Sequence, residues 1–567
     1  MKDLTTEDEY TNLPVGYMAT ERGISLVGDN EFEDFAEGPW LCSRIQVLGS
    51  GCRENGTDWG RVVEITDPRG AKHVVCLFNA NSATEHLKIL KSRGLRINAD
   101  VPRVDKVLAK LLTEWNTPDQ YLFVDRLGWA DDACTTFTFA ADKHIGTKKI
   151  FLMCDTGNEM RRHVKGSLDD WKTSVAALCV GNPVMVFSVS IALAAPFMQL
   201  LNRDSFTVHL RGRSSCGKTT ALRVANSVWN PPCGLQNWRT TSNGLESVAV
   251  AANSTLLTLD ELGQVSATAA DEASYMLGNE RGKRRARTDG SGSPCKTWKL
   301  IALSSGEISL AEKVSEGGKV TKLGQEVRFI DIEADTYAHG IFSNLCGEPD
   351  GNALAKKLNA AVKATFGTPG YAMVKFLTVH QKKVTAIASS FIDVWLSEQA
   401  SLTPGGLDGP GSRVAQNFAI IAAAGEIATA KGFTDWPKGA AKDAATELFK
   451  RWLAAREKPV REISREILNF ADRNTNKIET LGQSAIPDRV GYHDTEHLYL
   501  SSVSWKRIFT QDQSRTALTC LSDSGVLVRA GTHFSTKMGR SVPNRERHYK
   551  LLKEKLRKLA ESDALNE

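Results

Sequence analysis

A glycine-rich loop at residues 212–219 carries the residue types and spacing that point most directly to chemistry. It reads Gly-Arg-Ser-Ser-Cys-Gly-Lys-Thr and fits the GxxxxGK[ST] pattern of phosphate-binding loops. In such loops the backbone N–H groups near the glycines point at phosphate oxygens, at the positive end of the next helix. Lys218 is expected to reach the β- and γ-phosphates of a nucleotide, and the Thr219 hydroxyl to bind Mg²⁺. The predicted nucleotide-binding residues of the loop are Gly212, Ser214, Ser215, Cys216, Gly217, Lys218, Thr219 and Thr220.

The segments on either side of the loop decide between a phosphate site and a chance glycine turn. Residues 205–210 alternate and are rich in strand formers, and residues 220–229 have the composition of a helix. A strand before the loop and a helix after it are the context that this motif needs. We therefore interpret the loop as part of a nucleoside triphosphate site, with ATP and Mg²⁺ as the expected ligands.

Two adjacent carboxylates follow an apolar run about forty residues after the loop. Residues 254–259 are typical of a buried strand, and Asp260 and Glu261 come directly after them. Acidic side chains at the carboxyl end of such a strand would lie beside the phosphates. Asp260 is expected to support Mg²⁺, and Glu261 to polarise the attacking water as a general base.

A third apolar strand is expected at residues 297–303, before Ser304 and Ser305. In AAA+ ATPases, which this arrangement resembles, the strand after the acidic pair ends in a polar residue that senses the γ-phosphate. Ser304 or Ser305 occupies this place, where Asn is more usual, and we take Ser304 as the predicted sensor.

A basic segment lies between the acidic pair and the third strand. Asp289-Gly290 is typical of a hairpin tip, and five basic residues flank it: Lys283, Arg284, Arg285, Arg287 and Lys296. Such residues would neutralise DNA phosphates without reading sequence. The alternative is a solvated loop that happens to be basic, and the position beside the nucleotide strands favours DNA.

Composition limits the other possibilities. A chain of 567 residues needs several domains, and a net charge of +5 requires any DNA contact to come from local clusters. Eleven cysteines without CxxC spacing predict reduced thiols in a cytoplasmic protein, with neither a zinc site nor a disulfide framework. The uncharged stretch 174–201 is long enough to span a bilayer. Because glycine and proline interrupt it, we expect two buried helices and no membrane contact.

Four domains are predicted from the pattern along the chain. They are a β-rich N-terminal domain at 1–165, an α/β nucleotide-binding core at 166–345, a helical lid region at 346–460 and a winged-helix-like basic domain at 461–567. In the first domain we expect strands at 40–48, 60–66 and 72–78, and helices at 81–93 and 103–115. In the last, Lys537 and Arg540 are predicted DNA contacts on a wing, with a solvated terminal helix face as the alternative.

The motifs also carry a family resemblance. The loop at 212–219 and the segments 238–246, 259–263, 303–307 and 324–328 occur in the order typical of the family called domain of unknown function 927. That family occurs on mobile elements and phages and includes self-loading replicative helicases similar to AAA+ replicative helicases. The resemblance extends from about residue 40 to the C-terminus and is strongest at 205–335.

The resemblance implies an AAA+ P-loop NTPase core that assembles as a ring, a hexamer in expectation, with ATP sites between subunits. Arg328 is then the candidate arginine finger for a neighbouring subunit, against the alternative of a salt-bridged core arginine. Arg413, which opens a helix after a Gly/Pro loop, is the candidate sensor arginine of the lid.

These features together predict an ATP-dependent DNA helicase or translocase of the replication-initiator type, acting on single-stranded or forked DNA. A DNA-binding loader or assembly switch without processive unwinding is the alternative, and a signalling NTPase is a weaker one. No primase or polymerase motif occurs in the sequence, so a separate protein is expected to supply priming.

Overall fold

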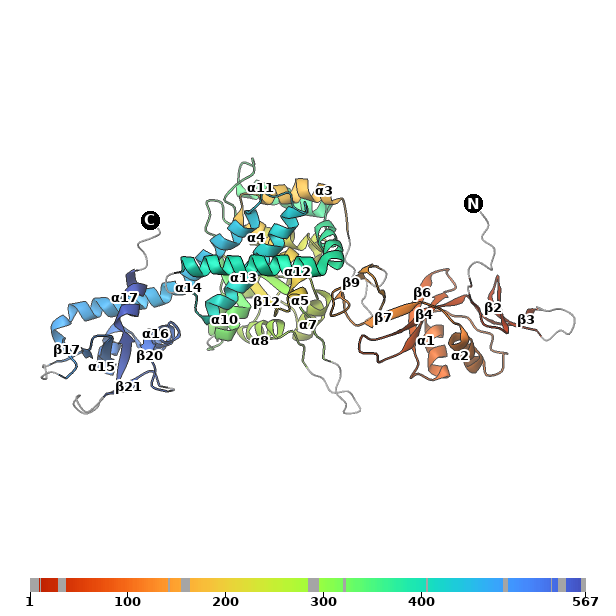
Figure 1. The fold of residues 1–567 in the computed structure, drawn as a ribbon, viewed down its shortest axis with the longest axis horizontal. Helices are drawn as coiled ribbons and strands as arrows, with labels where there is room; N and C mark the ends of the chain where they lie inside the picture. Colours follow the sequence, from red (N-terminus) through yellow and green to blue (C-terminus); the bar gives the residue numbers. More distant parts are fainter. Residues whose placement is uncertain are drawn as a thin grey trace. The chain divides into compact units, whose positions relative to one another are not determined.

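The computed structural model describes residues 10, 12–28, 37–140, 143–153, 164–283, 295–319, 323–403, 406–482, 488–531, 533–538 and 547–561. Its contacts divide the chain into two compact units, residues 1–448 and 449–567 (Figure 1). The boundary lies twelve residues before the predicted start of the C-terminal domain. The three domains predicted within the first unit remain a prediction.

The N-terminal part of the first unit is built on a mixed five-stranded sheet of order β11-β7-β4-β5-β6. Its strands are β4 (Ile45–Cys52), β5 (Gly60–Thr66), β6 (Lys72–Phe78), β7 (Gln120–Val124) and β11 (Lys149–Leu152). Helices α1 (Ala83–Ser92) and α2 (Val104–Glu114) bury Leu90, Leu108 and Leu111 in the same core as this sheet. The predicted helices and the strand pair at 60–78 are confirmed.

The N-terminal part also contains two small antiparallel sheets. They are formed by β1 (Tyr17–Thr20), β2 (Gly23–Val27) and β3 (Glu37–Cys42), and by β8 (Gly128–Trp129), β9 (Thr136–Ala140) and β10 (Lys143–Gly146). The single strand expected at 40–48 is therefore wrong. It is divided between β3 and β4, which belong to different sheets.

The second half of the first unit surrounds a parallel five-stranded sheet of order β13-β14-β15-β12-β16. The strands are β12 (Phe206–Arg211), β13 (Gln236–Asn237), β14 (Leu256–Asp260), β15 (Ile301–Gly306) and β16 (Phe329–Glu333). Helices α6 (Lys218–Asn226) and α4 (Pro183–Ala194) contact one face, and α8 (Ala267–Gly278) and α10 (Leu323–Arg328) contact β12 from the other (Figure 1). One strand, β15, separates the strand of the glycine loop from the strand of the acidic pair.

The stretch at 174–201 folds as predicted. Every residue from 184 to 194 in α4 is buried, and α5 (Phe197–Leu200) follows after Pro196. Trp229, after α6, donates its indole N–H to the Ala192 carbonyl at 2.8 Å and fixes α4 on the core. Within the described ranges, no helix combines the length and the apolar character needed to cross a bilayer.

Residues 351–448 are helical. They form α11 (Gly351–Ala364), α12 (Thr368–Leu402), α13 (Gly409–Ala430) and the first part of α14 (Ala440–Arg473). α13 packs on α4, and α11 packs on α6. The helix that carries the loop lysine is thus covered by a helix from much later in the chain.

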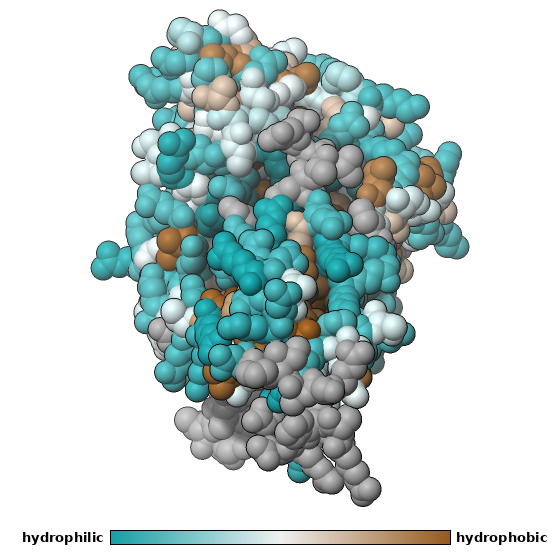
Figure 2. Space-filling model, turned by 90° about the vertical axis from the view of Figure 1, so that its left-hand side faces the viewer, coloured by the Kyte–Doolittle hydropathy of each residue, from teal (hydrophilic) through white to brown (hydrophobic). Residues whose placement is uncertain are grey.

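The second unit, residues 449–567, combines a sheet with short helices. The sheet contains β17 (Ile478–Thr480), β18 (Gly491–His493), β19 (His497–Ser501), β20 (Leu527–Val528), β21 (Thr536–Lys537) and β22 (Arg547–Leu552). Helices α15 (Ser502–Ile508) and α16 (Gln511–Asp523) precede the β20–β22 strands, and α17 (Lys553–Glu561) ends the unit. On the face drawn in Figure 2, hydrophilic side chains predominate and apolar ones form small separate groups.

Candidate nucleotide site

The glycine loop connects β12 directly to α6, as the sequence predicts. Gly217 has a φ of 106°, in the region that glycine adopts without strain, and a Cβ there would come within 2.9 Å of Ile341. Ser214 and Ser215 are exposed on the loop. The Gly212 N–H donates to the Gly306 carbonyl at 3.2 Å, and the Arg213 N–H donates to Asp335 at 3.2 Å. The later residues of the loop lead into the amino terminus of α6, where backbone N–H groups can meet an anion.

The ammonium of Lys218 lies over this loop. Its Nζ donates to the carbonyl oxygens of Gly212 at 2.8 Å and Arg213 at 2.6 Å, and the residue is buried. Thr220, also predicted to bind nucleotide, is buried, and its hydroxyl accepts from Asn359 of α11 at 3.4 Å. The Thr220 side chain therefore faces α11, and its contribution to a phosphate site is limited to the backbone.

The predicted Mg²⁺ ligands lie next to each other. The Thr219 hydroxyl donates to both carboxylate oxygens of Asp260, at 3.3 and 3.2 Å, and Ser305 donates to the same carboxylate. Hydroxyl and carboxylate oxygens are suitable ligands for Mg²⁺, which uses one or two carboxylates together with substrate phosphates. Among the described residues, no group of three or more His, Cys, Asp or Glu side chains is arranged to hold a metal ion.

Glu261 has an unusual backbone conformation at the end of β14. Its φ of 63° is left-handed, and its N–H donates to the Ser305 hydroxyl at 3.3 Å. A non-glycine residue held there costs on the order of 1 kcal/mol, and such strain clusters at functional sites. The Glu261 carboxylate lies beside Gly263, in the turn that follows the strand.

The two serines considered as sensors, Ser304 and Ser305, lie in different environments. Ser304 is fully buried, and its hydroxyl is bonded to Trp238 Nε1 at 2.8 Å and His209 Nδ1 at 2.9 Å. Since successive strand residues face opposite sides of a sheet, Ser305 faces Asp260 and Ser304 does not. The residue at the nucleotide edge is Ser305, and the Ser304 assignment is corrected accordingly.

Burial also shifts the pKa values of two side chains near the site, His209 and Asp331. The imidazole of His209 lies in β12 and bonds through Nε2 to the Ile308 carbonyl at 3.0 Å. Desolvation lowers its pKa to about 4, so His209 is neutral near pH 7. Burial raises the pKa of Asp331, in the neighbouring strand, to about 6, although Arg211 is paired to it at 3.0 Å.

Residues 335–342, which the sequence did not suggest, complete the loop. Arg213 pairs through Nε with Asp335 at 2.6 Å, and the Ile341 N–H donates to the Cys216 carbonyl at 3.0 Å. A Cβ at Gly340 would come within 2.3 Å of that same carbonyl oxygen. The carboxyl ends of neighbouring parallel strands meet at one edge of a sheet. The position of Asp335 just beyond β16 was therefore the sequence signal that could have indicated a residue near the loop.

Arg328 lies at the opposite edge of the sheet. It ends α10 directly before β16, whose Phe329 is level with Thr207 and whose Glu333 is level with Arg211. Four residues of strand correspond to about 13 Å, so Arg328 is distant from the loop of its own subunit. It is half-buried, and its side chain lies against Gly278 of α8.

Arg413 lies at this second edge as well. It is exposed near the start of α13, and Gln416, one turn later, accepts from Arg203 Nη1 at 3.1 Å. Arg203 precedes β12 by three residues. The structure therefore does not bring Arg413 to the glycine loop of the same chain.

The base of the basic hairpin is described, but its tip is not. Gly282 N–H donates to the Lys296 carbonyl at 2.9 Å, and Arg281 is bridged to Thr297. Lys283 Nζ lies 3.1 Å from Glu272, and Lys296 Nζ lies 3.5 Å from the Ser247 hydroxyl. Arg284, Arg285, Arg287 and the Asp289-Gly290 tip lie outside the described residues, as does Arg540. Lys537 is exposed on β21.

Comparison with known proteins agrees with this architecture. One solved structure, titled SCCmec type IV Cch, an active helicase, is 16% identical, with a TM-score of 0.60 over 96% of this chain and 98% of that one. The fold is therefore shared over nearly the whole length. No curated protein matches.

Two other solved structures align less well. The C-terminal region of NrS-1 is 11% identical, with a TM-score of 0.27 over 67% of this chain and 87% of that one. NtrX from Brucella abortus, in complex with ATP, is 13% identical, with a TM-score of 0.18 over 48% and 52%. Similarity this low carries no conclusion about the present chain.

A family model covers the N-terminal part and the nucleotide loop. Residues 17–296 match the model described as Domain of unknown function (DUF927). The match includes the loop, Asp260 and Glu261, and it ends before Ser305 and Arg328. The resemblance to this family is therefore shown over residues 17–296.

Proposed function

We propose that this protein is an ATP-dependent DNA helicase or translocase of the replication-initiator type, from a mobile element or phage, and that it acts as a ring. The observation that carries the proposal is the division of the hydrolysis residues between two edges of one sheet. Lys218, Thr219, Asp260 and Glu261 lie at the carboxyl edge, and Arg328 lies at the amino edge. A complete site then needs two subunits.

The strand order supports an AAA+ core. A strand inserted between the loop strand and the acidic strand places Ser305 beside Asp260, where a polar sensor of the γ-phosphate belongs. The match to a helicase fold over nearly the full chain supports the same assignment.

ATP hydrolysis would use these residues in distinct roles. The Lys218 ammonium would leave the loop carbonyls and neutralise the β- and γ-phosphate oxygens, while the α6 amino terminus donates backbone hydrogen bonds. Thr219 and Asp260 would hold Mg²⁺, which when bound offsets negative charge on the transferred phosphoryl group. Glu261 would orient the attacking water and accept its proton.

The neighbouring subunit would supply the remaining charge. Arg328, and Arg413 at the same edge, would approach the γ-phosphate across the subunit boundary and stabilise the transition state. Six subunits are the expected number. DNA would be held by the hairpin at 281–297 and by the second unit, whose α15–α16 pair and β20–β22 strands have the order of a winged helix, with Lys537 on the wing. A separate primase or polymerase would complete replication.

Unwinding of a forked DNA by the purified protein tests this function. We expect ATP-dependent strand separation by the wild type, with a loss of at least about 100-fold in Lys218→Ala and Glu261→Gln. Equal strand separation by all three proteins would contradict the proposal. ATP-dependent ring formation without strand separation would favour the loader or switch.

A further inference from the structure

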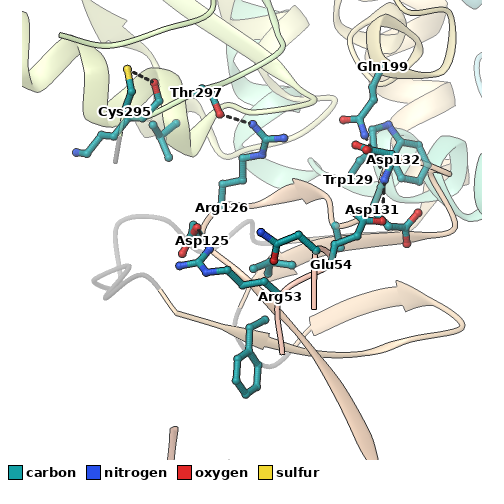
Figure 3. A pocket seen from close by; sticks show the side chains of 16 residues that line it. Arg53, Glu54, Asp125, Arg126, Trp129, Asp131, Asp132, Gln199, Cys295 and Thr297 are labelled. Carbon is teal, nitrogen blue, oxygen red and sulfur yellow. Dashed lines mark hydrogen bonds and ion pairs between the residues drawn. The ribbon is translucent and has the colours of Figure 1, made fainter. Parts of the chain in front are cut away.

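A cleft of about 450 Å³ lies beside the base of the hairpin, within the first unit. Its walls come from the loop after β4, from the segment between β7 and β8, and from the returning strand of the hairpin at 295–297 (Figure 3). The cleft therefore joins the N-terminal sheet region to the segment that we assign to DNA.

Four carboxylates line the cleft, and two of them, Asp125 and Asp131, are paired with cations. Asp125 is paired with Arg53, and Asp131 lies 3.5 Å from Lys148 and accepts from Thr135. Glu54 accepts the backbone N–H of a neighbouring lining residue at 3.4 Å. The ion pairs reduce the repulsion of a bound anion by Asp125 and Asp131, while Glu54 and Asp132 form no ion pair with a described residue.

Arg126 is a half-buried cation of this cleft, and the negative charges of Asp132, Asp125 and Glu280 lie near enough to act on it. Its Nη1 donates to the Thr297 hydroxyl at 2.8 Å, across the cleft in Figure 3, and it forms no ion pair with a described residue. Its guanidinium carries five N–H donors, and this neutral hydroxyl is the one acceptor recorded for them among the described residues. Burial lowers its pKa, although it remains charged near pH 7.

A half-buried guanidinium whose N–H donors lack acceptors costs free energy, unless an anion or water accepts hydrogen bonds from them. The planar guanidinium can donate two parallel hydrogen bonds to two oxygens of one phosphate. Lys296, beside Thr297 on the hairpin strand, adds a second positive charge on the same wall. A chain of phosphates that follows the hairpin would therefore pass this cleft.

We infer that Arg126 is a phosphate-binding residue of the DNA path, and that the cleft receives one backbone phosphate of the strand held by the hairpin. The inference rests on the proposed function. It assigns to the junction with the N-terminal region a direct contact with nucleic acid, and not merely a structural connection.

The test measures binding of a fluorescent oligo-dT strand by the full-length protein at several salt concentrations. Arg126→Ala is expected to weaken binding on the order of tenfold and to reduce the slope of log K against log salt by about 0.7, the value for one phosphate on a single strand. Arg126→Lys should restore the slope but only part of the affinity, because an ammonium lacks the fork. Basal ATPase activity and the melting temperature verify folding.

Thr297→Val is the matched control. It removes the hydrogen-bond acceptor of Arg126 but keeps the guanidinium, so wild-type slope and affinity are expected. If Thr297→Val and Arg126→Ala weaken binding equally without a change of slope, Arg126 only braces the hairpin and the inference is overturned. The inference is also overturned if Arg126→Ala binds the strand with the affinity and salt slope of the wild type. In that case, fork unwinding by the wild-type protein would still support the proposed function. Absence of DNA binding in the wild type would overturn both.

Discussion

At the scale of single residues, the two adjacent serines of β15 allow a sharp test of the site. Ser305→Ala removes a hydrogen bond to the carboxylate that is expected to support Mg²⁺, and loss of such an outer contact typically costs about 10- to 100-fold in activity. Ser304→Ala deletes the acceptor of the buried Trp238 indole and should cost about 1 to 3 kcal/mol of stability. Steady-state ATPase assays and thermal melts on both variants should give opposite patterns.

The neutral His209 predicts a pH dependence of stability. Its folded pKa of about 4 lies below its ordinary value of 6.5, so the folded state resists protonation. The contribution of neutral His209 to the free energy of unfolding is therefore complete above pH 6.5. It decreases as the pH falls toward 4, by on the order of 2 to 3 kcal/mol. His209→Gln should reduce this fall, as measured by urea unfolding between these pH values.

Asp331 has the opposite effect and needs its own control. Its folded pKa of about 6 lies above the ordinary 3.8, so its contribution is largest below 3.8 and is lost as the pH rises through about 6. Asp331→Asn removes this trend and should leave the acid loss from His209 unchanged. If Asp331→Asn abolished the acid loss, the assignment to His209 would be wrong.

At the scale of elements, the segment at 335–342 is expected to shape the nucleotide loop. Gly340 has a φ of 75°, and a Cβ there would come within 2.3 Å of the Cys216 carbonyl oxygen. Gly340→Ala should therefore displace the loop and weaken nucleotide binding by about 1 to 3 kcal/mol. A titration with a fluorescent ATP analogue measures this.

Gly347 provides the comparison. Its φ is 83°, but nothing lies within 4 Å of a Cβ at that position. Gly347→Ala carries the backbone strain without the clash and should bind nucleotide as the wild type does. Equal weakening in both variants would show that strain alone, and not contact with the loop, is responsible.

The same elements show what sequence patterns can and cannot predict. The strand, loop and helix at 205–229 follow from local composition, because their residues interact mainly with near neighbours. The choice between Ser304 and Ser305 depends on which face of β15 each occupies, and an almost wholly apolar strand gives no alternation to decide it. Asp335 and Gly340 are recognisable only once β16 is placed beside β12.

At the scale of the whole molecule, the separation of Arg328 from the loop predicts complementation between inactive variants. Lys218→Ala and Arg328→Ala should each lose at least about 100-fold in ATPase activity. Mixed in equal amounts, they should recover activity, because about one quarter of randomly formed interfaces contain an intact loop and an intact arginine. Absence of recovery in mixed oligomers would place Arg328 outside the neighbouring site.

The distance of about 13 Å along β16 also determines how activity responds to concentration. A single subunit holds the loop and the acidic pair at one edge, while Arg328 lies at the other. On dilution below the assembly range, turnover per molecule should then decrease steeply, although each chain still binds ATP. Such a protein would consume almost no ATP while dispersed, and its energy use would begin only where DNA gathers enough copies in one place.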